Sequence, residues 1–282
     1  MVILIRYGEL SLKGQLRRKF ENTLVSNILR VAKKEGIKGK IKREWGRLYY
    51  YTSLPEDFVA KRIAYIFGVV STSPAFECTS DLEDIAKTAE NLSELISKFE
   101  SFAVKVRRVG THDYTSMDVA RYVGERLKNK TGLKVNLKNP DFKLSIEVRE
   151  EKAYVYFKVF SGFGGLPVGT QERVIAMDEY SSWFALRRGC DIDVPEKVLE
   201  SYPQLKALSC YRRIGTVDLS FEDVLKSDYP AVFCSYSMDE ILKLVDVLKN
   251  RNMPVLTPLA SEKIYSKGRV AKLLKSISEM IK

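Results

Sequence analysis

The sequence predicts a globular, multidomain protein that begins as an α+β fold and ends as an α/β fold. The 282 residues are 45% hydrophobic, enough for two or three separate cores. The first part of the chain mixes helical stretches with strands of alternating hydrophobic and polar residues. The last part repeats short apolar strands separated by helices, which is typical of a parallel sheet.

The first 75 residues predict the order β-α-β-β-α. An apolar strand at 2–7 is followed by a helix, by strands at 39–44 and 47–52, and by a second helix from Pro55 to about residue 67. The first helix shows one apolar stripe, made of Leu16, Phe20, Leu24, Ile28 and Val31. This order indicates a small ferredoxin-like domain at 1–75.

Residues 76–165 predict a second α+β domain. We expect a helix from Asp81 to about residue 99, a strand at 102–109, a helix from Ser116 to Asn129, and alternating strands at 133–138, 142–149 and 153–160. The residues expected to face inward are Leu133, Val135, Leu137, Phe142, Leu144, Ile146, Val148, Val155, Phe157 and Val159. The opposite face is expected to be cationic, with Lys134, Lys138, Lys143 and Arg149.

Residues 166–282 predict a small Rossmann-like parallel-sheet domain. Apolar strands are expected near 174–177, 191–194, 214–219, 231–236 and 253–259, and helices at 238–249 and 270–281.

The positive charge is concentrated in the front of the chain. Residues 1–165 hold 30 Lys and Arg against 20 Asp and Glu, a difference of +10, whereas residues 166–282 hold 17 against 16, a difference of +1. Such a surplus favours a polyanion such as nucleic acid, although a lysine-rich soluble surface is the alternative. The sequence shows no apolar run of membrane-spanning length and no signal peptide, so we expect a cytoplasmic protein without membrane contact.

The four cysteines are scattered along the chain and predict free thiols. Cys78, Cys190, Cys210 and Cys234 show no C-x-x-C spacing, and one histidine cannot complete a zinc set, so no metal site is expected. Cys234 is expected to be a buried cysteine at the end of a strand, and the alternative is that the N-terminus of the predicted helix after it lowers the thiol pKa.

Several segments resemble the tRNA 4-thiouridine synthetase family over nearly all of residues 1–177. They include "ILIRYGELSLKG", "FAVKVRRVGTHDYTS", "TGLKVNLKNPD" and "GFGGLPVGTQ". The resemblance implies a ferredoxin-like domain at 1–75, a THUMP domain at 76–165 and a PP-loop ATP pyrophosphatase-type domain at 166–282. In that family the first two domains bind tRNA, and the third adenylates a uridine before sulfur delivery. The resemblance also implies a homodimer.

The third domain departs from the family at its ATP loop. The family pattern is Ser-Gly-Gly-x-Asp-Ser, in which glycines let backbone N–H groups approach phosphate. Here only Asp178, Glu179 and Tyr180 stand between the strand 173–177 and a helix expected near Ser181, and two carboxylates there repel phosphate. The alternative is that Ser181 and Ser182 bind a displaced phosphate, although serine at a helix start is more often an N-cap.

We therefore expect a tRNA-binding module with no ATP, no other cofactor and no catalytic residue of its own. The expected partners are tRNA and a separate tRNA-modifying or sulfur-donor enzyme to which the module presents the tRNA. The rival interpretations are an active tRNA thiolation enzyme that obtains its nucleotide loop or sulfur relay from a partner chain or uses a displaced nucleotide site, and a structural subunit. The expected RNA contacts form two groups, one at the first turns of a helix and one on the strands of the THUMP domain. They are Lys13, Arg17, Arg18, Lys105, Arg107, Arg108, His112, Lys134, Lys138 and Lys143.

Overall fold

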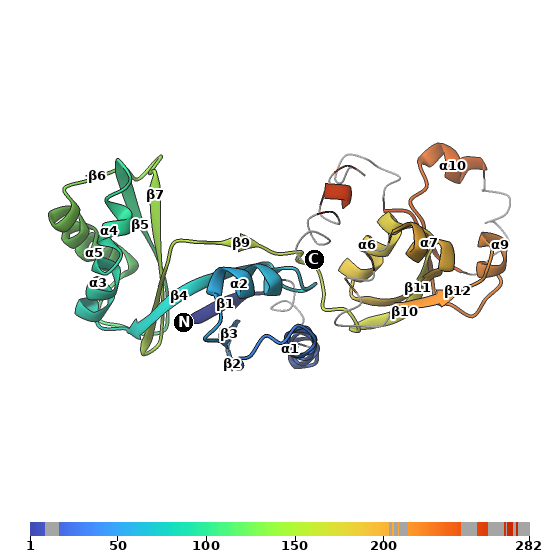
Figure 1. The fold of residues 1–282 in the computed structure, drawn as a ribbon, viewed down its shortest axis with the longest axis horizontal. Helices are drawn as coiled ribbons and strands as arrows, with labels where there is room; N and C mark the ends of the chain where they lie inside the picture. Colours follow the sequence, from blue (N-terminus) through green and yellow to red (C-terminus); the bar gives the residue numbers. More distant parts are fainter. Residues whose placement is uncertain are drawn as a thin grey trace. The chain divides into compact units, whose positions relative to one another are not determined.

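The computed structural model describes residues 1–8, 17–202, 205, 208, 214–243, 253–258, 268, 270–272 and 275. The chain divides into two compact units (Figure 1). Unit 1 comprises Met1–Ile5, Gly39–Ala60 and Thr72–Phe160, and unit 2 comprises Arg6–Lys38, Lys61–Ser71 and Ser161–Lys282. Within the described part, no helix combines the length and the apolar character that crossing a membrane requires.

The front of the chain follows the predicted order of elements. These are β1 (Val2–Arg6), α1 (Arg17–Lys34), β2 (Lys40–Glu44), β3 (Arg47–Tyr51) and α2 (Glu56–Ala64). Four residues of the predicted stripe on α1 are buried, namely Phe20, Leu24, Ile28 and Val31, and Leu16 lies outside the described residues. Helix α2 ends before residue 67, because turns follow it and Gly68 takes a φ of 100°, which no helix allows.

The strands of unit 1 belong to one sheet with the order β2-β3-β1-β4-β8-β7-β5-β6. The elements beyond α2 are β4 (Ser71–Thr79), α3 (Leu82–Glu90), α4 (Ser93–Ile96), β5 (Ser101–Val109), α5 (Ser116–Thr131), β6 (Lys134–Val135), β7 (Phe142–Arg149), β8 (Lys152–Tyr156) and β9 (Phe160–Ser161). The single helix predicted from Asp81 to residue 99 is wrong, because the chain turns at Asn91 and Leu92 and two helices result.

Helices α3, α4 and α5 share a hydrophobic core with β5, β7 and β8. The predicted inward-facing residues Phe142, Leu144, Ile146, Val148 and Val155 are buried there, and Leu133 and Phe157 pack at its edge. The prediction is wrong for Val135, Leu137 and Val159, which are 47%, 79% and 56% exposed. The reason is that β6 has only two residues and β8 ends at Tyr156, so these side chains lie at a sheet edge or in connecting segments.

The third domain contains a parallel sheet, as predicted. Its elements are β10 (Gln171–Ala176), α6 (Glu179–Arg187), β11 (Cys190–Pro195), α7 (Glu196–Ser201), β12 (Gly215–Val217), α9 (Phe221–Val224), β13 (Val232–Phe233), α10 (Met238–Lys243) and β14 (Val255–Leu256). Each neighbouring pair in the order β12-β11-β10-β13-β14 is parallel. The helix predicted at 270–281 and the end of the one at 238–249 fall largely outside the described residues.

Candidate functional site

The strand order of the third domain places a candidate ligand site between β10 and β13. Strands β11 and β12 are added on one side of β10, and the chain then returns to add β13 and β14 on the other side of β10. In open parallel sheets, ligands bind outside the carboxyl ends of the strands where the order reverses. Residues 177–178 after β10 and 234–235 after β13 occupy that position here, which we call the switch point.

The carboxylate of Asp178 lies at this point and caps α6. Asp178 has extended backbone angles and is the N-cap of α6. Its Oδ1 accepts hydrogen bonds from the N–H groups of Tyr180 (3.0 Å) and Ser181 (2.9 Å). Its Oδ2 accepts one from the N–H of Ser235 (2.9 Å), which follows β13. Backbone N–H groups that could bind a phosphate at a helix N-terminus are therefore taken by a side chain of the protein.

Ser181 and Ser182 are fully buried and also belong to this cap. The hydroxyl of Ser181 donates to the carbonyl oxygen of Asp178 (3.0 Å), and the N–H of Asp178 donates to the hydroxyl oxygen of Ser181 (3.1 Å). The hydroxyl of Ser182 donates to the same carbonyl at 2.7 Å. The helix begins at Glu179, two residues earlier than predicted, because Asp178 and Ser181 form a capping box.

The two acidic residues at the helix entrance play different roles. Glu179 is only 7% exposed, and burial, with a smaller contribution from the charge of Asp178, raises the pKa of its carboxyl. The expectation that both carboxylates face a ligand is therefore wrong. The carboxylate at the entrance is that of Asp178, and Glu179 is a buried acid whose charged form is disfavoured.

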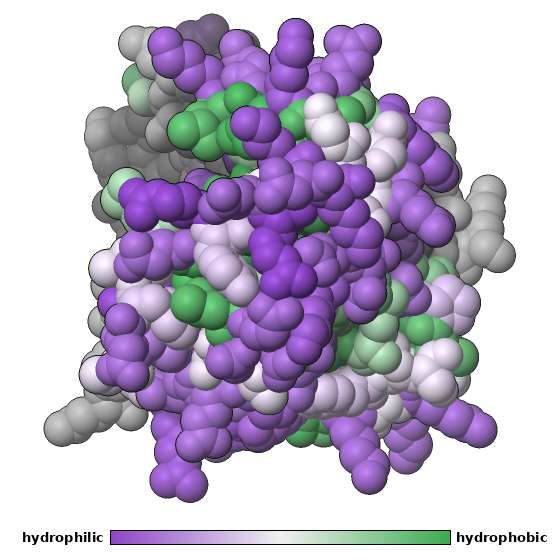
Figure 2. Space-filling view, turned by 90° about the vertical axis from the view of Figure 1, so that its left-hand side faces the viewer, coloured by the Kyte–Doolittle hydropathy of each residue, from purple (hydrophilic) through white to green (hydrophobic). Residues whose placement is uncertain are grey.

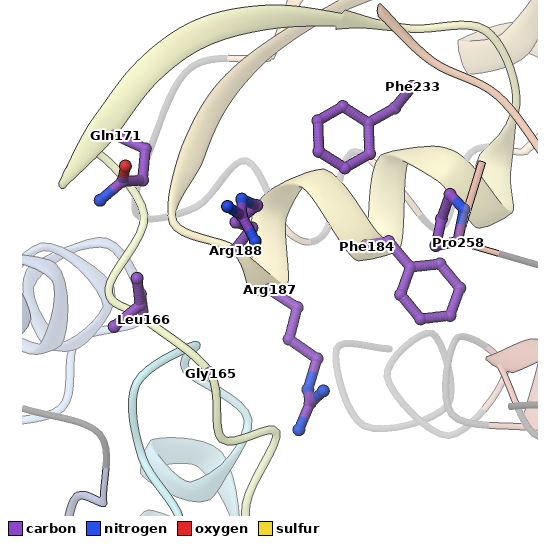
Figure 3. A pocket seen from close by; sticks show the side chains of 8 residues that line it. All are labelled: Gly165, Leu166, Gln171, Phe184, Arg187, Arg188, Phe233 and Pro258. Carbon is purple, nitrogen blue, oxygen red and sulfur yellow. The ribbon is translucent and has the colours of Figure 1, made fainter. Parts of the chain in front are cut away.

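A cavity of about 380 Å³ lies beside the other end of α6 (Figure 3). Arg187 extends from the helix toward the segment of Gly165, and its Nε donates to the carbonyl oxygen of Phe163 at 3.1 Å. Arg187 and Arg188 stand at the C-terminal end of α6, where cations are electrostatically favoured. The helix end therefore favours this pair of arginines, and Arg187 also binds the segment that contains Phe163.

Four of the predicted RNA-binding residues share one face of the unit 1 sheet. Lys105 and Arg107 are exposed on β5, and the parallel registers β5–β7 and β5–β6 place Lys143 and Lys134 on the same face. Lys138 is exposed in the turn that follows β6. The sequence prediction that Arg149 is a solvated member of this face is wrong, because that side chain is buried and pairs with Glu147 at 3.0 Å.

The other predicted RNA-binding residues are placed differently. Arg108 and His112 connect the end of β5 to the β7–β8 turn, with Arg108 Nη1 3.2 Å from His112 Nδ1 and His112 Nε2 2.7 Å from the carbonyl oxygen of Glu150. The neutral imidazole with its proton on Nε2 satisfies both contacts. Arg17 pairs with Glu21, Arg18 is exposed on α1, and Lys13 lies outside the described residues.

The described cysteines have raised thiol pKa values. Burial raises the pKa of Cys234 to about 12 and that of Cys190 to about 11, and it also raises the pKa of Cys78. The expectation that Cys234 is a buried cysteine at the end of a strand is confirmed, since it is 0% exposed, and the alternative of a thiol pKa lowered by a helix N-terminus is wrong. Cys210 lies outside the described residues, and within the described part no group of His, Cys, Asp and Glu side chains is arranged to hold a metal ion.

Sequence reasoning missed two features of this chain. It did not foresee that Asp178 also binds Ser235, which lies 57 residues away. It also gave no attention to Trp45, which is 77% exposed at the tip of the β2–β3 hairpin. The signal for the second was present, since Glu44-Trp45-Gly46 places an aromatic residue beside a turn glycine with a φ of 77°.

The face drawn in Figure 2 is mostly hydrophilic, with hydrophobic residues in separate small patches.

Comparison with known proteins identifies the front of the chain. Residues 2–73 match the model of the ThiI ferredoxin-like domain, and residues 79–158 match that of the THUMP domain. Together the two matches cover 152 of the 282 residues.

Similar proteins carry related names. A probable tRNA sulfurtransferase of Methanobrevibacter smithii is 36% identical over 206 residues, which are 68% of this chain and 52% of that protein. The chain thus spans about half the length of such relatives. The crystal structure of PH1313 from Pyrococcus horikoshii Ot3 matches with a TM-score of 0.80 and 28% identity over 98% of this chain and 99% of that one.

A 4-thiouridine synthetase solved in complex with RNA and ATP has the same fold, with a TM-score of 0.70 and 23% identity over 99% of this chain and 85% of that one. Both domain models, the relatives and the solved folds agree. The chain therefore belongs to the ThiI family of THUMP-domain proteins, which includes the tRNA sulfurtransferases.

Proposed function

We propose that this protein binds tRNA through residues 1–165 and acts as a binding module in tRNA modification, without an ATP site of its own. Its domains are proposed to be the ferredoxin-like domain at 1–75, the THUMP domain at 76–165 and a reduced PP-loop-type domain at 166–282. The observation that carries the proposal is the carboxylate of Asp178 at the switch point, held by three backbone N–H groups.

The residues at the switch point do not fit a nucleotide phosphate. A triphosphate placed there meets a carboxylate in the position that its own oxygens need, and like charges at a partly buried site repel strongly. No glycine stands between the end of β10 and the start of α6, so there is no glycine-backed loop to supply other N–H groups. We therefore derive no step that passes through ATP.

The support for tRNA as the ligand comes from charge and from the relatives. The surplus of +10 in residues 1–165 falls on the part that contains the THUMP domain. Lys105, Arg107, Lys134 and Lys143 stand on one sheet face, where cations can contact phosphates without competing with a helix dipole. The relatives named tRNA sulfurtransferase favour tRNA over other polyanions.

Calorimetry with ATP and magnesium tests the nucleotide part of the proposal. We expect no saturable binding, while the same preparation binds tRNA and so proves to be folded. ATP binding tighter than about 100 µM, which is about 5 to 6 kcal/mol of affinity, or release of pyrophosphate in the presence of tRNA, refutes the proposal. It would restore the rival function, a tRNA thiolation enzyme that uses a displaced site or a partner chain.

If ATP does bind, variants of the two cap serines, Ser181 and Ser182, test where it binds. Loss of ATP binding in Ser181→Ala and Ser182→Ala would place the nucleotide along α6, although both hydroxyls now donate to the carbonyl oxygen of Asp178. Retained binding in both variants would place it elsewhere.

We also propose that the protein is a homodimer, in which case residues 166–282 contribute to assembly rather than to chemistry. Sedimentation at micromolar concentration decides this point. A stable species with the 32.2 kDa mass of one chain contradicts it.

A further inference from the structure

We propose that Trp45 is a stacking platform for an unpaired base of the bound tRNA. The inference rests on the proposed tRNA binding and adds to it a recognition residue outside the THUMP domain. Base–aromatic stacking needs an exposed aromatic face, a rigid mount and a cationic surrounding that attracts the RNA backbone. The β2–β3 hairpin of unit 1 provides all three.

Trp45 is largely exposed to solvent. It is 77% exposed, the largest exposure of any aromatic side chain in the described part of the chain. The other tryptophan of the sequence, Trp183, is 1% exposed. Exposing so much of an aromatic ring forgoes its burial energy, and tryptophan is enriched at surfaces that bind a partner.

The backbone of the hairpin tip is fixed by a buried ionic cluster. Arg149 Nη2 donates to the carbonyl oxygen of Trp45, and Arg47 Nη1 donates to that of Gly46 at 2.8 Å. Both guanidinium groups pair with the carboxylate of Glu147, at 3.0 Å from Arg149 and 2.8 Å from Arg47. Glu147 is 1% exposed. Two arginines and one glutamate therefore hold the two carbonyls of a surface turn, which is more support than a solvated turn needs.

The charge around Trp45 favours RNA. Residues 40–45 carry three basic side chains, Lys40, Lys42 and Arg43, against Glu44, a difference of +2 over six residues. All three basic residues are exposed on β2, an edge strand of the sheet. Lysines on an edge strand also prevent strand pairing between molecules. That role does not explain the tryptophan beside them, whereas a nucleic acid ligand explains both.

Intrinsic fluorescence tests the contact directly, because the sequence has only two tryptophans and Trp183 is buried. We expect saturating tRNA to quench the emission of the wild-type protein. Trp45→Phe keeps an aromatic face, so it should bind tRNA with an affinity within a few-fold of wild type, and its remaining Trp183 emission should not change.

The affinity of Trp45→Ala gives the second measurement. Loss of one base–aromatic stack should weaken tRNA binding by about 5- to 150-fold. The slope of affinity against salt should stay at the wild-type value, because no phosphate contact is removed. Phe58→Ala is the matched control, since Phe58 is 48% exposed on α2 and is expected to leave the affinity unchanged.

The possible outcomes separate this inference from the proposed function. If the wild-type protein does not bind tRNA, both fail. If it binds tRNA while Trp45→Ala keeps wild-type affinity and the wild-type emission stays unquenched, the stacking inference alone fails. An equal loss in Phe58→Ala also overturns it, because the effect would then belong to the whole surface and not to the indole.

Discussion

Replacing Glu147 by alanine should be among the most destabilising single substitutions in unit 1. Glu147 is 1% exposed and pairs with Arg47 and Arg149, which are 7% and 8% exposed. Removing one partner of a buried ion pair leaves uncompensated charge and costs about 3 to 5 kcal/mol. Here the substitution leaves two buried guanidinium groups without their carboxylate partner. A domain has about 5 to 15 kcal/mol of stability in total, so the loss is a large share of it.

Urea unfolding measures this cost. With a dependence on urea of about 2 kcal/mol per molar, the unfolding midpoint of unit 1 should fall by about 1.5 to 2.5 M. Hydrogen exchange of the backbone amides of β7 and β8 reports unit 1, and the emission of the buried Trp183 reports unit 2, so a loss confined to unit 1 can be recognised.

Asp57→Asn is the matched control for Glu147→Ala. Asp57 pairs with Lys158, and these side chains are 42% and 45% exposed. An exposed pair contributes at most about 1 kcal/mol, so the midpoint should move by less than about 0.5 M. If Glu147→Ala moves it no further than this control, the buried cluster does not stabilise unit 1 and the reasoning is refuted.

Three other predictions concern charge and acidity. Replacing Lys105 and Arg107 together by alanine should weaken binding to all tRNA species and lower the salt slope by about 2, and an unchanged slope contradicts phosphate contact. Glu179→Gln should raise stability at pH 7, because burial raises the pKa of Glu179 in the folded state and its ionisation opposes folding. The gain should vanish as the pH falls below the ordinary glutamate pKa of about 4.5, where both states are protonated; a gain independent of pH would contradict this cause. Cys190 and Cys234 should resist alkylation at pH 8 until the protein unfolds, since burial raises their pKa values to about 11 and 12. Rapid labelling of the two thiols in the native protein would contradict their burial.

The sequence predicted the strands of this protein better than the contacts between distant segments. Alternation in residues 142–149 correctly placed Phe142, Leu144, Ile146 and Val148 in the core. It could not show that Arg149 is buried as well, because the carbonyl oxygen that accepts its hydrogen bond belongs to Trp45, 104 positions earlier in the chain. The period of the hydrophobic residues shows which face of a strand is apolar, and hydrogen bonds from the polar face to a distant hairpin leave no periodic signal.

The error at residues 133–138 had a different cause. The pattern Leu133, Val135, Leu137 favours a strand, yet the chain turns after Val135. The side chain of Asn136 accepts from the N–H groups of Lys138 (3.2 Å) and Asn139 (3.1 Å), which closes a local turn. Asn-Pro at 139–140 is a turn signal that the sequence already contained, so local hydrogen bonding outweighed alternation here.

At the switch point of the third domain, the lack of a glycine loop is visible in the sequence, whereas the hydrogen bond between Ser235 and Asp178 is visible only in the fold. The absent glycine loop can be recognised from residues 178–180 alone. The bond from the N–H of Ser235 to Asp178 depends on β13 lying beside β10, which no local pattern specifies. Under the proposed function, the two features together leave the switch point without a glycine loop and with a carboxylate that caps α6. Restoring a phosphate site would require removing that cap, at a cost of about 0.5 to 2 kcal/mol, and supplying new N–H donors in the same step. A single substitution of Asp178 does only the first, so it should loosen the start of α6 without creating ATP affinity.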